Sequence, residues 1–216
     1  MPDIISQLED IMKKVVLALV LAIMLLVVPT ALFAEISGDP LQTFDCPFLL
    51  TSGGQGAGSK MLRLLINQSK KFTLGENADF WLEDETPESY AEIDSGRYPP
   101  LVIVISVTEK GLGASGITIE DEIGFLKEVL AKAKAQNMKI VAVSMEADAR
   151  APKLPTNGNE RIIDLVCPQS DWIISIKANN ADDRFTKISK EYGIPLTIID
   201  KPMDLVQAAP SIFIKK

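Results

Sequence analysis

The sequence predicts one α/β domain of three layers, built on a mostly parallel β-sheet. Short apolar runs alternate along the chain with segments of helical periodicity, which is the pattern of parallel βαβ units. Several of these runs are rich in β-branched residues and nearly continuous, as in strands that are buried on both faces. The chain has 216 residues, of which 47% are apolar, so it can bury one sizeable core.

The expected strands occupy residues 47–51, 101–107, 139–145, 172–177 and 195–199. A weaker run at 78–83 alternates apolar and charged residues, which is typical of a half-exposed edge strand. With that strand in the sheet, we expect the flavodoxin-like order 2-1-3-4-5(-6), the sixth strand lying beyond the fifth. If residues 78–83 form a loop, a Rossmann-like order is the alternative.

Helical periodicity is clearest after residue 118. Apolar residues from Ile119 to Ala133 recur at spacings of three and four, so they form one stripe. Thr118 and Asp121 have the spacing of a capping box at the start of this helix. A later helix should end at Gly193, because Pro195 follows it.

The N-terminal segment has the composition of a secretory signal peptide. Lys13 and Lys14 precede an apolar run at 15–28, and Pro29 and Ala34 follow it. We expect residues 1–34 to be a signal peptide cleaved after Ala34, with an uncleaved membrane anchor as the alternative. Residues 35–46 then read as a linker and 47–216 as the α/β domain, which places the protein outside the cytoplasm, secreted or periplasmic.

Composition excludes several classes of site. The chain contains no histidine, so a Ser-His-Asp triad, a Cys-His dyad and a His-ligated metal site are ruled out. Its 29 acidic and 22 basic residues give a net charge of -7, whereas nucleic-acid-binding proteins normally carry a basic face. We therefore expect no nucleic-acid partner, and contact with a membrane only through the N-terminal segment.

Two glycine-rich segments, 51–60 and 109–116, follow the expected strands at 47–51 and 101–107. These strands are the first and third in chain order when the run at 78–83 is counted as the second. In a flavodoxin-like sheet these two strands flank the point where strand order reverses, and ligands of open α/β sheets bind there. Polar residues after the next strand, Glu146 among them, reach the same edge. The predicted ligand-binding residues are Thr51, Ser52, Gly53, Gly54, Gln55, Gly56, Lys110, Gly111, Gly113, Glu146 and Arg150.

Neither glycine segment matches a nucleotide-binding motif. In the first, Ser59-Lys60 stands where a P-loop requires Lys followed by Ser or Thr. The second segment has the spacing Gly111-x-Gly113-x-x-Gly116, but three residues separate the end of the expected strand from Gly111. In a dinucleotide-binding fingerprint the first glycine follows the strand directly, in a tight turn. We expect no cofactor and no metal, although backbone amides alone can hold a small anion.

The two cysteines test the expected topology. In the flavodoxin-like order Cys46 and Cys167 precede strands that lie three spacings apart, roughly 14 Å, which is too far for a disulfide. In the Rossmann-like order these strands would be neighbours. We therefore expect two buried thiols.

Four stretches resemble an uncharacterised family of exported bacterial proteins, known only as a domain of unknown function. They are Leu50-Thr51-Ser52-Gly53-Gly54-Gln55, Lys110-Gly111-Leu112-Gly113-Ala114-Ser115-Gly116-Ile117, Glu146-Ala147-Asp148-Ala149-Arg150 and Asp182-Asp183-Arg184-Phe185-Thr186-Lys187-Ile188. The resemblance covers about residues 47–210 and implies no activity. Ala149 and Ala151 depart from the family pattern beside Arg150.

The sequence leaves more than one function open. The first hypothesis is a module that binds a small polar or anionic ligand at the glycine-rich segments. The alternative is a hydrolase or transferase that works without histidine, through Ser52 or Glu146. A flavin-binding domain is a third hypothesis. Whether the protein is an enzyme, which ligand it binds and its oligomeric state stay open.

Overall fold

The computed structural model describes residues 12, 14–15, 36–45, 48–69, 93–94, 96, 98–146, 157–205, 208 and 213–214. The chain divides into two units, Met1–Phe33 and Ala34–Lys216. In the first unit only Met12, Lys14 and Val15 are described, and these are helical. The apolar segment expected to act as a signal peptide therefore lies almost entirely outside the described residues. No described helix has the length and apolar character needed to span a bilayer.

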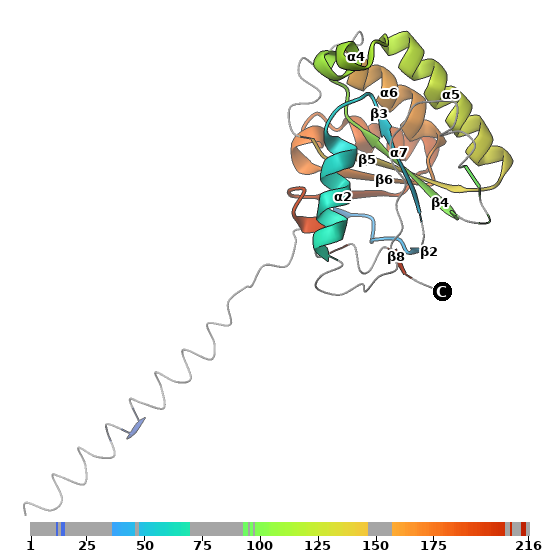
Figure 1. The fold of residues 1–216 in the computed structure, drawn as a ribbon. Coiled ribbons are helices and arrows are strands. Elements are labelled where there is room, and N and C mark those ends of the chain that lie inside the picture. The colour runs from blue at the N-terminus through green and yellow to red at the C-terminus, as the bar shows by residue number, and fades with distance from the viewer. Residues whose placement is uncertain are drawn as a thin grey trace, which may run out of the picture. The chain divides into compact units, whose positions relative to one another are not determined.

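The second unit is built on a mixed six-stranded sheet in the order β1-β7-β6-β5-β4-β3 (Figure 1). The strands are β1 (Ile36–Gly38), β3 (Leu49–Gly53), β4 (Pro100–Ile105), β5 (Lys139–Ser144), β6 (Trp172–Ile176) and β7 (Leu196–Ile199). Strands β3 to β7 are parallel, and β1 pairs antiparallel with β7. Two further short strands, β2 (Phe44–Asp45) and β8 (Phe213–Ile214), pair in parallel as a separate ribbon.

The α/β class is as predicted, but the strand order differs from the flavodoxin-like expectation. The five parallel strands follow one another across the sheet in chain order, and an antiparallel strand, β1, closes the end beyond β7. The expected edge strand at 78–83 lies outside the described residues. The Rossmann-like alternative is also wrong, because β3 pairs with β4 whereas β6 pairs with β5 and β7.

Helices cover both faces of the sheet. The helices are α2 (Gly58–Ser69), α4 (Glu109–Ser115), α5 (Ile119–Ala135), α6 (Gly158–Val166) and α7 (Arg184–Tyr192), with 3-10 turns at Cys167–Gln169 and Lys177–Asn180. Helix α2 packs on the face that carries Val102 and Val104. The other four pack on the face that carries Ile103 and Ile105. The connections after β3 and β4 therefore leave the sheet on opposite sides (Figure 1).

The helix ends follow the predicted capping chemistry. The hydroxyl of Thr118 accepts the Asp121 amide at 3.2 Å, and the Asp121 carboxylate accepts the Thr118 amide at 2.8 Å, so the capping box is confirmed. Helix α7 ends at Gly193, whose φ of 67° is in the left-handed region. Glycine adopts this conformation without steric cost, which explains its place there.

Residues 36–45, expected to form a linker, instead contribute two strands to the fold. Asp39 fastens β1 in place: its amide donates to the Leu196 carbonyl at 2.7 Å, and its carboxylate accepts the Leu196 amide at 2.8 Å. Its carbonyl also accepts the Thr197 hydroxyl at 2.8 Å. The polar composition of this segment is typical of a linker. Strand β1 is nevertheless attached to β7 mostly through main-chain hydrogen bonds, and these do not depend on side-chain hydropathy.

Cys167 is buried and carries a thiol, as predicted for that residue. Cys46 lies outside the described residues. The observed sheet keeps β3 and β6 three strand spacings apart, roughly 14 Å, which is the separation on which the prediction of two thiols rests.

Candidate functional site

The loop after β3 lies against the segment that follows β4, at the C-terminal edge of the sheet. Three of its amides donate to protein acceptors: Gly54 to the Glu122 carboxylate at 2.5 Å, Gly56 to the Ser106 carbonyl at 2.7 Å, and Gly58 to the Ser106 hydroxyl at 3.3 Å. Amides that cradle a phosphate must be available to it. In this conformation these three are already used within the fold.

The glycines of this loop are required by close packing. Gly54 has a φ of 120°, and a Cβ there would collide with Val107. A Cβ on Gly56 would collide with Ser106. The two segments are also joined by a bridge between Gln55 and Val107. The loop therefore needs glycine for contact with its own neighbour, in addition to any contact with a ligand.

Two buried polar side chains hold this contact in place. Glu122, from the first turn of α5, has no exposed surface and binds the Gly54 amide. Asn159, at the start of α6, accepts the Val107 amide at 2.9 Å and donates to the Val107 carbonyl at 3.0 Å. One side chain thus satisfies both main-chain groups of Val107, so the segment that follows β4 is attached to the start of α6.

Most of the second glycine-rich segment lies in helix α4. Thr108 caps α4 by accepting the Gly111 amide at 3.0 Å, and Gly116 ends it with a φ of 70°. A Cβ on Gly111 would collide with the Gln55 carbonyl, whereas Gly113 has open space around it. Gly111 thus packs on the first loop, and Gly113 and Lys110 lie exposed on the outer side of α4.

A polar network joins the ends of β4, β5 and β6. The Ser106 hydroxyl donates to the Glu146 carboxylate. The Asn179 amide group donates both to the Glu146 carbonyl at 3.0 Å and to the Ser144 hydroxyl at 2.9 Å. Glu146 is therefore held through its side chain and through its main chain. The residue is half-buried, so this fixed carboxylate lies at the boundary with solvent.

Ser52 adds a buried hydroxyl to the same edge. It is 5% exposed, and its oxygen has no hydrogen-bond partner among the described residues. It pairs in register with Val104, and Ser106 comes two residues after Val104, just past the end of β4. Side chains two residues apart on a strand point to the same face, so Ser52 and Ser106 both face the side covered by α2.

The predicted site residues separate into groups. Glu146 is joined to the start of α2 through the Ser106 hydroxyl, which also accepts the Gly58 amide. Ser52 lies on the neighbouring strand β3, and the main chain of Gly54 and Gly56 lies at the same edge. Thr51 and Gly53 continue β3, and Gln55 bonds to Ser115 at 3.1 Å. Lys110 and Gly113 lie apart from this cluster on α4. Arg150 lies outside the described residues.

Sequence reasoning missed Ser106, Glu122 and Asn159. Glu122 follows two exposed acidic residues, Glu120 and Asp121, but the buried residues of α5 are Glu122, Leu126, Leu130 and Ala133. The spacing of Glu122 from Leu126 is the signal that could have found it, because residues four apart share a helix face. Ser106 directly follows the apolar strand β4, and no spacing in the sequence distinguishes it from an ordinary residue at a strand end.

A family model described as "Domain of unknown function (DUF6305)" matches residues 45–213. The chain belongs to this family. The match confirms the resemblance to an uncharacterised family, and its limits enclose every parallel strand of the sheet. No curated protein matches the chain.

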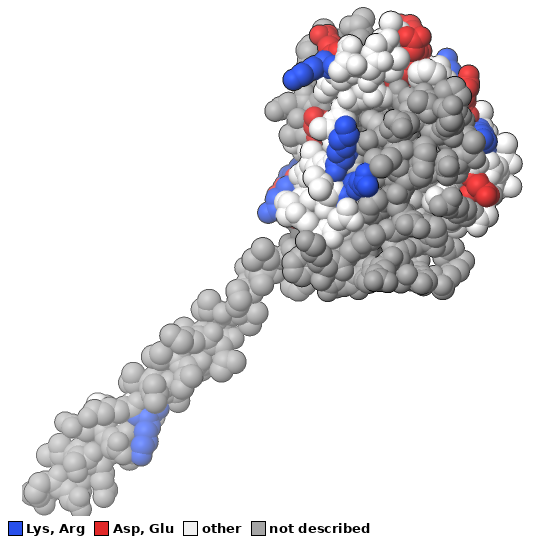
Figure 2. All heavy atoms as spheres, viewed as in Figure 1, with Lys and Arg blue, Asp and Glu red and all other residues white. Residues whose placement is uncertain are grey.

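Within the DUF6305 region, the described acidic and cysteine side chains do not form a metal-binding cluster. Among the residues that the structure describes, no three acidic or cysteine side chains are grouped closely enough to hold an ion. On the face shown in Figure 2, the described basic and acidic side chains lie in small separate groups. The described polar groups of the C-terminal edge are hydroxyls, amides and the carboxylates of Glu122 and Glu146.

Proposed function

We propose that this protein acts outside the cytoplasm and binds a small polar ligand at the C-terminal edge of the sheet, through the half-buried carboxylate of Glu146, which lies beside the buried hydroxyl of Ser106. The observation that carries the proposal is the fixed position of Glu146. Its carboxylate is bound by Ser106 and its carbonyl by Asn179. A carboxylate held in advance loses little entropy when a ligand binds it, which is the advantage of a preorganised site.

The same geometry favours a ligand rich in hydrogen-bond donors over an anion. The Gly54 amide is bound to a protein carboxylate, and Ser106 occupies the amides of Gly56 and Gly58. A second carboxylate, Glu146, lies at the solvent boundary of the edge. An anion would meet the Glu146 carboxylate, whereas a sugar hydroxyl or an amine would donate to it.

Calorimetric titration of the purified protein tests the proposal, with monosaccharides, short alkyl amines and inorganic phosphate as probes. We expect binding of a sugar or an amine that Glu146→Ala weakens by at least tenfold. Glu146→Gln keeps an acceptor for Ser106 and removes the charge, so it distinguishes sugar binding from amine binding. Binding of a sugar should be largely kept, whereas binding of an amine should be lost.

Glu128→Ala is the matched control, since Glu128 is exposed on α5 and should not affect binding. Circular dichroism must show that each variant is folded. Binding of phosphate alone, or binding that Glu146→Ala leaves unchanged, contradicts the proposal.

A second candidate function is hydrolysis or group transfer without histidine. The Ser106–Glu146 hydrogen bond favours it, because a carboxylate beside a hydroxyl can act as a general base. Ser106 has no exposed surface, so the start of α2 would have to move before a substrate could reach it. Turnover of 4-nitrophenyl acetate that Ser106→Ala abolishes would establish this function in place of simple binding.

A further inference from the structure

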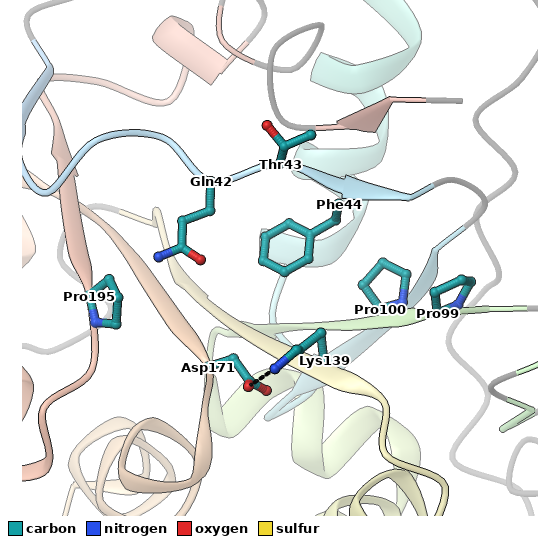
Figure 3. A pocket seen from close by; sticks show the side chains of 8 residues that line it. All are labelled: Gln42, Thr43, Phe44, Pro99, Pro100, Lys139, Asp171 and Pro195. Atoms are coloured by element: carbon teal, nitrogen blue, oxygen red, sulfur yellow. Dashed lines mark hydrogen bonds and ion pairs between the residues drawn. The ribbon is translucent and has the colours of Figure 1, made fainter. Parts of the chain in front are cut away.

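We propose that a hollow at the opposite, N-terminal edge of the sheet is a second binding site, which takes a small organic carboxylate with an aromatic or apolar body. The hollow has a volume of about 480 Å³ and lies between strand β2 and the starts of β4, β5, β6 and β7 (Figure 3). This volume is within the range of small-molecule sites. The proposal does not rest on the function proposed for the C-terminal edge.

An ion pair forms one wall of the hollow. The Lys139 ammonium donates to one oxygen of Asp171 at 2.8 Å, and the other oxygen of Asp171 accepts the Ile140 amide at 2.9 Å. Figure 3 shows this pair across the hollow from the side chains of Gln42 and Phe44. The wall is therefore charged, and its geometry is tied to the main chain of β5.

The ion pair is better suited to an added anion than to an added cation. Both oxygens of Asp171 already accept hydrogen bonds. An ammonium has three donors, and among the described residues one of those of Lys139 is used, on Asp171. The Lys139 side chain is also 61% exposed, so its remaining donors can reach a ligand carboxylate without the burial of an unpaired charge.

Apart from Gln42 and Thr43, the rest of the lining is suited to an apolar body. Phe44 faces the hollow, and Pro99, Pro100 and Pro195 form its rim (Figure 3). The Phe44 ring stacks on the buried ring of Trp172, with ring centroids 5.6 Å apart and planes at 25°. A flat ring inserted here would contact Phe44 and the proline rings while its carboxylate meets Lys139.

Benzoate is the probe that tests this site in the purified protein. Benzamide has nearly the same shape without the charge, and acetate has the charge without the ring. We expect benzoate to bind more tightly than either, with a change in tryptophan fluorescence because Trp172 stacks on Phe44. The readout is made in a Trp81→Phe background, since the chain has two tryptophans.

Two variants should act in opposite directions. Lys139→Gln removes the cation and should weaken benzoate about fivefold, to the level of benzamide. Asp171→Asn keeps an acceptor for the Ile140 amide but frees Lys139 from its partner, so benzoate should bind about threefold more tightly. Lys127→Gln, at an exposed position on α5, and Glu146→Ala at the other edge should both bind benzoate like the unmodified protein.

The proposal is overturned if benzoate and benzamide bind equally, if Lys139→Gln leaves benzoate binding unchanged, or if benzoate produces no saturable signal. Since Asp171→Asn is predicted to gain affinity, a loss of binding through misfolding cannot imitate the expected result.

Discussion

The carboxylate of Glu122 accepts the amide of Gly54 at 2.5 Å, across 68 residues of sequence. This buried side chain binds the first glycine-rich loop from within the fold. Truncation by Glu122→Ala leaves the Gly54 amide without this acceptor and should lower the free energy of unfolding by about 2–4 kcal/mol, whereas Glu122→Gln should cost about half as much. Urea denaturation measures both, and Glu128→Ala should change stability by no more than about 0.5 kcal/mol. Equal effects at residues 122 and 128 would contradict this role.

Asn159 holds both main-chain groups of Val107. Asn159→Ala removes two buried hydrogen bonds and should destabilise the protein by about 2–3 kcal/mol. Asn159→Asp keeps the acceptor but loses the donor to the Val107 carbonyl and buries a charge, so it should be the more damaging change. Denaturant titration checks this order. Asn67→Ala, at a half-buried position on α2, serves as the comparison, and a loss there as large as at Asn159 would refute the assignment.

Two glycines of one motif should respond in opposite ways to alanine. A methyl group on Gly111 would collide with the Gln55 carbonyl, so Gly111→Ala should destabilise by more than about 2 kcal/mol. Gly113 is exposed in helix α4 with open space around it, so Gly113→Ala should stabilise by about 0.5–1 kcal/mol. Thermal unfolding of the two variants measures these changes in stability and tests their opposite signs. A dinucleotide-type role for the motif would instead make ligand binding sensitive to both.

The start of α5 should make stability depend on pH in the acid range. The Thr118 hydroxyl and amide hold the pKa of Asp121 below its ordinary value. A hydrogen bond from Arg161 lowers the pKa of Glu120 in the same way. A carboxyl with a lowered folded-state pKa contributes stability that is present above its unfolded pKa and lost as the pH falls through the folded one. Stability should therefore decline as the pH falls below about 4.

Thr118→Ala removes the largest cause of the shift at Asp121. The pKa of Asp121 should return toward its ordinary value, and the acid dependence should become shallower, while Thr118→Ser should preserve both. Carboxyl titration by NMR, with unfolding measured across the same pH range, tests this. A pKa of Asp121 that stays low in Thr118→Ala would show that another group sets it.

Much of the fold was predictable because it depends on patterns within short stretches. The expected run at 139–145 became β5 (Lys139–Ser144), and the capping box at Thr118 formed as its spacing indicated. Such signals need only neighbouring residues. The strand β1 was missed since its three exposed residues carry no alternation, and what holds it is Asp39 acting on the distant Leu196.

The site was predictable only in part. Glycines after strands were correctly expected at the C-terminal edge, but their composition does not show what their amides bind. The acceptors are Glu122 and Ser106, which lie far along the sequence. Gly111 and Gly113 share one motif, yet they differ in what surrounds them. The role of each glycine depends on contacts between distant segments, and the periodicity of the sequence does not predict such contacts.

The attachment of β1 through Asp39 has a consequence for the time course of folding. During synthesis β1 emerges well before its partner β7, and the contact between Asp39 and Leu196 spans 157 residues. Contacts of such separation form late. Until β1 docks, the outer edge of β7 presents unpaired main-chain groups to any neighbouring chain. The interval between the folding of β7 and the arrival of β1 is therefore the period in which newly made molecules are most exposed to misassembly with one another.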